Sequence, residues 1–331
     1  MSLDNEKFQH RHAAHCESGV AASMLSHHGA AITEAMAFGL SSAMTFAYLP
    51  FVKIAGFPLI AYRMPPKAIL KGMVKPFDMR FHFETFRDPE KGMRRLDELL
   101  ELGKVVGLQT SAFWLPYFPE DMRFHFNAHN LMVYGKEGDD YLISDPVAEL
   151  PQRCPADALQ RARFAKGLMA PKGLLYYPDS IGRTEVTEEA VRRAIKKTVR
   201  NMLGPIPIIG VRGIRTLSNR VAKLNTADKL SLNYVGHIVR MQEEIGTGGA
   251  GFRFLYATFL QEAAMLPGLA ILAEFAERLV VIGDGWREFA LATVRMVKKR
   301  DDLNPAKLAD LLRVLADQEE AFFRDLKKAI A

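Results

Sequence analysis

The sequence predicts an α+β domain followed by an all-helical domain. In the first half, helical runs and short apolar runs typical of strands follow one another irregularly, without the regular alternation of a parallel sheet. From Thr184 onward the pattern is almost wholly helical. A chain of 331 residues is long enough for two domains. We expect them at 1–180 and 181–331, with the boundary within 177–184.

The first helix is expected to begin at Cys16. Cys16, Val20 and Met24 follow one another at steps of four, so they share one helical face. Gly29 is a plausible stop, because glycine is favoured just after a helix end and the two preceding histidines can interact with the last carbonyl groups. The next segment, residues 35–52, carries no charge and approaches the length of a membrane helix.

We expect a buried helix there that leads into a strand at 57–62, not a membrane span, because Pro50 and several small polar residues interrupt the run. Helical spacing then predicts a helix over 89–102. Apolar runs predict strands at 105–113 and 172–177, and a helix is expected at 155–170.

A hairpin is predicted between the strand at 105–113 and the helix at 155–170. Residues 129–135 and 141–145 have the character of strands, and the polar sequence between them predicts a turn. Pro146 ends the second strand, since it has no N–H for the ladder. Antiparallel pairing can bring His129 beside Asp145, which lie 16 positions apart in sequence.

Apolar residues at helical spacing mark the first helix of the second domain: Val191, Ile195, Val199 and Met202. Pro205 and Pro207 interrupt the pattern. Further helices are expected at about 227–245, 250–265, 267–282, 285–300 and 305–329.

Cys16 is the candidate nucleophile. In the first turn of a helix, a thiol faces unpaired N–H groups and the positive end of the macrodipole, and both favour the thiolate. A cysteine nucleophile needs a base, and the base needs an orienting group. His129 and Asp145 can supply these roles. A cysteine on a helix with a histidine and an aspartate on strands, in that order, is the papain-type arrangement.

Each of these residues also has a plainer explanation. Cys16 could be a small buried hydrophobic residue, His129 a structural residue at a strand end, and Asp145 a cap for the turn before Pro146. The histidines before residue 30 could also form a metal site with Cys16 as a ligand. No spacing there repeats a zinc pattern, so no metal is expected. Histidines at 10, 12, 15, 27 and 28 form this group.

Residues 10 to about 178 resemble the N-terminal domain of the butirosin biosynthesis protein H family, which is a papain-like acyltransferase family. Five short motifs carry the resemblance in order: residues 15–18, 34–39, 114–117, 129–135 and 144–146. The remainder, from about Ser180, resembles the helical domain of unknown function often attached to it. Residues 248–262 are the best matching segment there.

The resemblance implies acyl transfer in secondary metabolism. An acyl or aminoacyl group would pass from the thioester of an acyl carrier protein to Cys16, and then to a small amine acceptor deprotonated by His129. No resident cofactor is expected, because phosphopantetheine would arrive on the carrier. Candidate substrate contacts are His15, Glu34, Arg253 and Tyr256. His15 could also simply pack the helix start, and Glu34 could interact with a helix dipole.

The sequence departs from the papain pattern before Cys16. Papain-like proteases usually place a glutamine six residues before the cysteine for the oxyanion hole, whereas His10 stands there and Gln9 lies one position earlier. Tryptophan does not follow the cysteine as it does in papain. The backbone N–H of Cys16 is a natural oxyanion donor.

Composition favours a cytoplasmic globular protein. The first residues are polar and predict no signal peptide. Two cysteines, Cys16 and Cys154, do not form a disulfide framework, and Cys154 is expected to be an incidental thiol.

Charge is concentrated in residues 181–223, which hold ten basic and three acidic residues, a net charge of +7. No aromatic interleaving accompanies it, so nucleic acid is not expected. A solvated helix face is one explanation, and steering of an acidic carrier protein is the functional one.

Two other functions stay open from sequence. A hydrolase, either an amidase or a peptidase, could use the same three residues with water as the acceptor. A ligand- or carrier-binding protein could retain them without activity. Apolar helix faces in the second domain could also support a homodimer.

Overall fold

The computed structural model describes residues 7–54, 56–244 and 249–331. The chain forms two compact units, each built from two segments. The first unit contains the residues up to Ala37 together with Ile69–Val186, and the second contains Phe38–Ala68 together with Thr187–Ala331.

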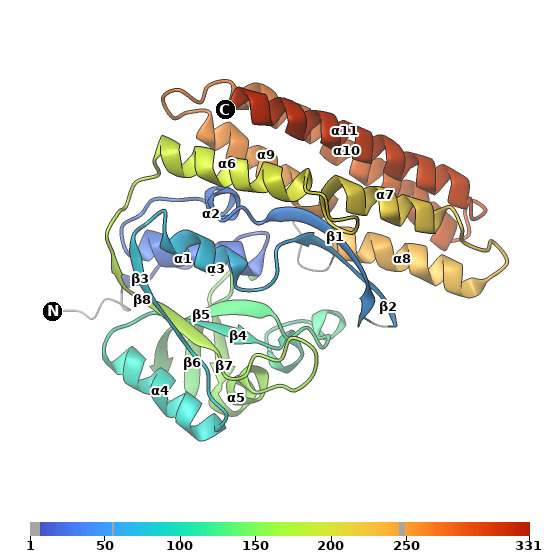
Figure 1. The fold of residues 1–331 in the computed structure, drawn as a ribbon. Coiled ribbons are helices and arrows are strands. Elements are labelled where there is room, and N and C mark those ends of the chain that lie inside the picture. Colours follow the sequence, from blue (N-terminus) through green and yellow to red (C-terminus); the bar gives the residue numbers. More distant parts are fainter. Residues whose placement is uncertain (1–6, 55, 245–248) are drawn as a thin grey trace. The chain divides into compact units, whose positions relative to one another are not determined.

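A six-stranded sheet organises the first unit, and each strand runs antiparallel to its neighbours (Figure 1). Its strands in spatial order are β3 (Met79–Glu84), β8 (Leu175–Ile181), β4 (Val106–Thr110), β5 (His129–Glu137), β6 (Asp140–Ser144) and β7 (Gln152–Pro155). The strand expected at 105–113 is therefore central, and the predicted hairpin is β5–β6. The expected α+β class is confirmed.

Helices flank this sheet, and short 3₁₀ turns follow β4. They are α1 (Cys16–His27), α3 (Ala68–Val74), α4 (Pro89–Glu101), α5 (Ala156–Arg163), η2 (Ala112–Trp114) and η3 (Glu120–Met122). Leu96 of α4, Leu108 of β4, Leu131 of β5 and Leu159 of α5 are fully buried in one core cluster. Helix α1 packs against β5. The helix α2 (Glu34–Leu40) lies where the chain passes from the first unit to the second.

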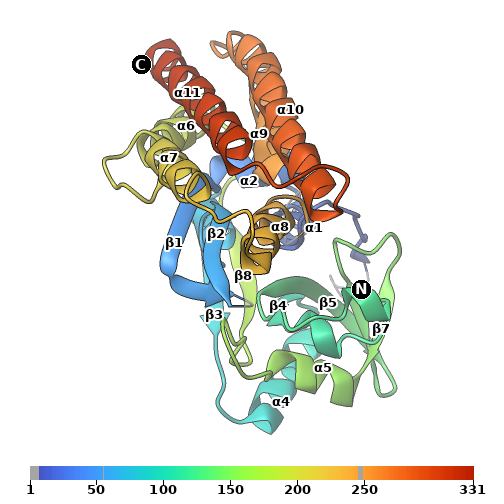
Figure 2. The same cartoon turned by 90° about the vertical axis from the view of Figure 1, so that its right-hand side faces the viewer.

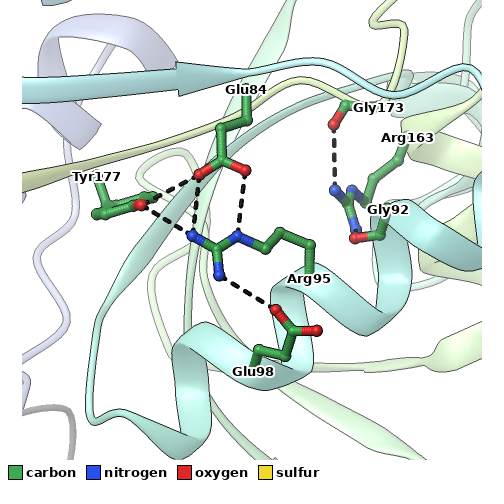
Figure 3. A network of polar contacts seen from close by, with 7 residues as sticks. All are labelled: Glu84, Gly92, Arg95, Glu98, Arg163, Gly173 and Tyr177. Atoms are coloured by element: carbon green, nitrogen blue, oxygen red, sulfur yellow. Dashed lines mark hydrogen bonds and ion pairs between the residues drawn. The ribbon is translucent and has the colours of Figure 1, made fainter.

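A buried arginine ties α5 to two other parts of the first unit (Figure 3). The Arg163 guanidinium is fully buried and donates to Gly92 O at 2.9 Å and to Gly173 O at 3.1 Å. Burial lowers the pKa of Arg163 to about 10, although Tyr141 and Asp97 act in the opposite direction. The group therefore stays charged at neutral pH and joins α5 to α4 and to the turn before β8.

Replacing Arg163 with methionine is expected to lower the free energy of unfolding by about 2–4 kcal/mol, because two buried carbonyl groups lose their donor. Chemical denaturation measures this change. Arg161→Met is the matched control, since Arg161 lies on the same helix but is about half exposed in an ion pair with Asp157. Equal changes in the two variants would contradict the assigned role.

The second unit is a helical array with one hairpin. Its helices are α6 (Glu188–Met202), α7 (Gly210–Val221), α8 (Lys229–Glu243), η4 (Ala250–Phe252), α9 (Arg253–Ala263), α10 (Leu272–Val297) and α11 (Pro305–Ala329). Helices α10 and α11 run side by side, as both Figure 1 and Figure 2 show. The hairpin consists of β1 (Met44–Ile54) and β2 (Phe57–Arg63), which pair antiparallel.

An ion pair lies in the core of this second unit. The Arg253 guanidinium contacts the Glu319 carboxylate at 2.8 and 3.0 Å, and both side chains are fully buried. Trp286 donates its indole N–H to the same carboxylate at 2.7 Å. The guanidinium also lies over the rings of Trp286 and Tyr62. Four segments of the unit, α9, α10, α11 and β2, therefore meet around this pair.

The units differ from the predicted domains because residues 38–68 belong to the second unit, which is therefore not all-helical. Strand β1 is held there by backbone pairing: Tyr48 N–H donates to Ile208 O at 2.9 Å, and Ala47 forms a bridge with Ile209. The Phe46 ring packs on Trp286 of α10. These partners lie about 160 or more positions away in the sequence, so no local pattern predicts the contacts.

Two helix predictions also change. The helix expected over 35–52 ends at Leu40, and strand β1 follows. The helices expected at 267–282 and 285–300 are one helix, α10. Gly283 does not break it; a Cβ there would lie 2.7 Å from the ring of Phe254, so this glycine permits close packing. Helix α7 fills a stretch for which no helix was predicted.

Within the described residues, no helix combines the length and the apolar character needed to cross a bilayer.

Candidate active site

Cys16 is the first residue of α1 and is 4% exposed. His15 caps the helix in an extended conformation, and its Nδ1 accepts from Ser18 N–H at 3.3 Å. The Cys16 thiol thus lies in the first turn, where N–H groups have no acceptor within the helix. The predicted helix start is confirmed by this geometry.

Glu34 fastens the segment that precedes Cys16. Its carboxylate accepts from Ala14 N–H at 2.9 Å and from His15 N–H at 2.7 Å. It also accepts from the Ser18 hydroxyl at 2.9 Å. Burial raises the pKa of Glu34, although these donors and His12 act in the opposite direction. The carboxylate thereby fixes both the entry to α1 and its first turn.

The hairpin brings His129 and Asp145 together. His129 begins β5, and Asp145 directly follows β6, its antiparallel neighbour. His129 Nε2–H donates to Asp145 Oδ2 at 2.6 Å, and the aspartate is fully buried. The second carboxylate oxygen accepts from Val147 N–H at 3.2 Å. The carboxylate is therefore held at both oxygens.

Electrostatics keep this imidazole charged. Burial alone would lower the pKa of His129, but the charge and hydrogen bond of Asp145 and the adjacent Cys16 raise it to about 10. The Cys16 side chain is within hydrogen-bonding reach of the imidazole. Since Nε2 is bound to Asp145, Nδ1 is the nitrogen left for the sulfur. His129 is thus an imidazolium at neutral pH, able to give a proton to a leaving group.

The loop after Asp145 packs closely on α1. Ala13 N–H donates to Pro146 O at 2.6 Å. A Cβ at Gly19 would lie 2.6 Å from the Pro146 Cβ, so a larger residue on α1 would push this loop away. Gly19 therefore lets the segments that carry Cys16 and Asp145 approach one another.

His10, at the position of the papain glutamine, contacts residues on both sides of Asp145 through its two ring nitrogens. Its Nδ1 lies 2.8 Å from Ser144 Oγ, and its Nε2–H donates to Ala148 O at 3.0 Å. A neutral imidazole has one donor and one acceptor nitrogen, so both are used. His10 therefore leaves no free side-chain donor at the position of the papain glutamine.

Tyr117 is a further member of the site that the sequence did not assign. Its hydroxyl donates to Asp145 Oδ2 at 2.7 Å, the oxygen that also accepts from His129. Burial raises the pKa of Tyr117 well above its usual range, and the charge of Asp145 adds to this. The phenol therefore remains a donor at any working pH. It lies in a matched motif, but nothing in its spacing indicates this contact.

Replacing Tyr117 with phenylalanine is expected to lower kcat/KM about tenfold, because Asp145 loses a charge-assisted hydrogen bond that fixes its position. Steady-state kinetics measure the effect. Tyr134→Phe on β5 is the control, since Tyr134 is only partly buried. A Tyr117→Phe enzyme with unchanged kcat/KM would show that His129 alone orients this carboxylate.

The other predicted substrate contacts lie in different surroundings. The His15 imidazole is buried, 2.7 Å from Ser18 Oγ. Arg253 and Tyr256 are buried in the second unit, where Arg253 pairs with Glu319 and the Tyr256 ring packs on Phe259. This packing accounts for both residues, and their substrate contact stays a prediction. Gly248, the first residue of the matching segment there, lies outside the described residues.

No group of three or more His, Cys, Asp or Glu side chains within the described ranges could hold a metal ion.

The site has the layout of the papain-like class of cysteine proteins: a cysteine opens a helix, a histidine begins a strand, and an aspartate directly follows the antiparallel neighbour of that strand. The chain matches the family described as butirosin biosynthesis protein H, N-terminal, over residues 15–146. Residues 157–326 match a domain of unknown function, DUF4872. The chain therefore belongs to the butirosin biosynthesis protein H-like family, as the sequence motifs predicted.

Among solved structures, the chain is similar to one described as a C39-like peptidase from Bacillus anthracis. The identity is 13% and the TM-score 0.38, with 54% of this chain and 98% of that chain covered. No curated protein matches the chain.

Proposed function

We propose that this chain is a cysteine-dependent acyltransferase that carries an acyl or aminoacyl group on Cys16. The observation that carries the proposal is the buried His129–Asp145 pair beside the thiol. His129 Nε2 and Asp145 Oδ2 lie 2.6 Å apart. Membership of the butirosin biosynthesis protein H-like family supports transfer as the reaction class.

The reaction balances with these three residues. Cys16 Sγ attacks the thioester carbonyl carbon, and the carbon–sulfur bond to the donor breaks as the tetrahedral intermediate collapses. The His129 imidazolium gives its proton to the departing pantetheine thiolate. The neutral imidazole then takes a proton from the attacking amine, and Cys16 leaves as a thiolate from the new amide. No resident cofactor takes part, because phosphopantetheine arrives on the donor.

Intact-protein mass spectrometry with a panel of acyl thioesters tests the proposal. The expected result is a mass increase equal to the acyl group, removed faster by an added primary amine than by water. Amide product should appear in proportion to the lost adduct. Discharge by water at the same rate, with free acid as the product, would show a hydrolase instead. Absence of any adduct, with Cys16 inert to iodoacetamide, would leave only a binding function.

An acyl carrier protein is the donor that we propose. Such carriers are acidic, and helix α6 presents Lys196, Lys197 and Arg200 as exposed cations. Arg192 on the same helix is engaged by Glu188 at 2.7 Å and by Gly268 O at 3.0 Å, so it is less available. A basic helix face can steer an acidic partner toward the enzyme.

Charge reversal tests the carrier surface. Changing Lys196, Lys197 and Arg200 to glutamate is expected to raise KM for a carrier-bound acyl group about tenfold or more at low salt. The KM for a free pantetheine thioester should not change. If both donors respond alike, this surface does not receive the carrier.

A further inference from the structure

A buried carboxamide stands beside the thiol in addition to the three predicted residues. Asn130 follows His129 on β5 and is 3% exposed. Its Nδ2 donates to Ala128 O at 3.0 Å and faces Cys16 Sγ at 4.0 Å. An amide nitrogen has two hydrogens, so one is donated to Ala128 O and the second points to the sulfur.

The orientation of this carboxamide is fixed by its partners. Ala128 O is a carbonyl oxygen and can only accept, so the Asn130 atom next to it must be the nitrogen. Asn130 Oδ1 then faces Tyr176, whose hydroxyl donates to it at 2.9 Å. Burial raises the pKa of Tyr176 well above its usual range, and the charges of Glu17 and Cys16 add to this, so the phenol keeps its proton.

Tyr176 is in turn held by the sheet. It lies on β8 opposite Gly107 of β4, and a Cβ at Gly107 would fall 2.0 Å from the Tyr176 ring. The glycine therefore leaves the space that the ring occupies. The arrangement runs from Gly107 through Tyr176 to Asn130, and it ends with an N–H beside the sulfur.

Acyl transfer needs donors for the negative oxygen that forms on the attacked carbon. That oxygen is two bonds from Cys16 Sγ, so a donor 4.0 Å from the sulfur is within reach of it. The backbone N–H of Cys16 can supply one donor. His10 cannot supply the second, because both of its ring nitrogens are engaged.

We propose that the Asn130 side-chain N–H is the second oxyanion donor of this enzyme, and that Tyr176 is the positioning residue that orients it. This inference rests on the proposed acyl-transfer function. It replaces the glutamine of the papain pattern with an asparagine from the strand that also carries the catalytic histidine.

Two reactions of the same thiol test it. Acylation by 4-nitrophenyl acetate passes through an oxyanion: a bond forms from Sγ to the carbonyl carbon, and 4-nitrophenolate leaves. Alkylation by iodoacetamide forms a bond from Sγ to a methylene carbon, iodide leaves, and no oxyanion appears. Neither reagent requires the natural carrier or acceptor.

Asn130→Leu, which keeps the branched shape of the side chain but has no donor, should lower the acylation rate about 100- to 1,000-fold. Its alkylation rate should stay within about threefold of the unchanged enzyme. Tyr176→Phe keeps the carboxamide and should lower acylation about tenfold, again without a matching loss in alkylation.

A parallel loss in both reactions would assign Asn130 to holding the thiol and overturn the proposal, as would unchanged acylation. If Asn130→Leu does not fold, Tyr176→Phe decides by the same ratio. Failure of the unchanged enzyme with every thioester would instead refute the proposed function, while the ratio of these two rates would still test Asn130.

Discussion

Replacing Cys16 with alanine is expected to abolish the acyl-enzyme adduct and to lower turnover about 10⁴-fold or more. The reason is that, in the proposed reaction, Cys16 forms the covalent intermediate, while His129 and Asp145 act only on protons. Intact-protein mass spectrometry after mixing with an acyl thioester measures the adduct, and steady-state kinetics measure turnover.

Cys154 provides a matched control. It is fully buried on β7, and burial raises its pKa to about 12, with the charges of Asp157 and Asp140 adding to this. It is therefore a neutral thiol at working pH and a poor nucleophile. Cys154→Ala should form the same adduct as the unchanged enzyme. An adduct that persists in Cys16→Ala and disappears in Cys154→Ala would show that Cys154, and not Cys16, is the nucleophile.

The three residues of the proposed site could be predicted to lie together because their placement depends on local structure. Cys16 opens a helix whose start and stop are visible in the sequence, and the turn of one hairpin sets the pairing of β5 with β6. Asp145 then lies beside His129 without any long-range information. Family motifs at these positions point to the same residues, and the family prediction is confirmed.

The segments that make up each of the two units could not be predicted in the same way. Strand β1 joins the second unit through bonds to Ile208 and packing on Trp286, both far along the chain. Such contacts depend on which surfaces meet, and hydrophobic spacing does not contain that information. Spacing accordingly predicts a helix over 35–52, although its second half, from Met44 onward, belongs to strand β1.

The two tyrosines that donate to Asp145 and to Asn130 could not be predicted, for a related reason. Tyr117 reaches Asp145 from the loop after η2, and Tyr176 reaches Asn130 from another strand, 46 positions away. Each is an ordinary tyrosine in its own segment. Only the order of strands in the sheet, with β8 beside β4 and β4 beside β5, brings these hydroxyl groups to the site.

Replacing Asp145 with asparagine is expected to lower kcat/KM about 10³- to 10⁴-fold with little change in volume. The carboxylate charge is the main influence that raises the pKa of His129 to about 10, against burial, which lowers it. Without that charge the pKa should fall toward or below its ordinary value of 6.5. The imidazole would then lack its proton when the donor thiolate must leave.

The pH profile tests this cause directly. Activity that needs the imidazolium is lost as pH rises through the pKa of His129, so the basic limb of the unchanged enzyme should lie near 10. In Asp145→Asn this limb should move to lower pH. Stability should follow the same sign. A raised histidine pKa stabilises the fold fully below pH 6.5, and this contribution disappears as pH rises to about 10.

Asp139→Asn is the control for the isosteric change, because Asp139 is exposed in the turn of the same hairpin. It should leave both the rate and the profile unchanged. If Asp145→Asn slows the reaction without moving the basic limb, the carboxylate acts only by orienting the ring. If the limb moves and the rate recovers at lower pH, the charge on His129 is what Asp145 supplies, and the buried pair is the source of the proton in the first half-reaction.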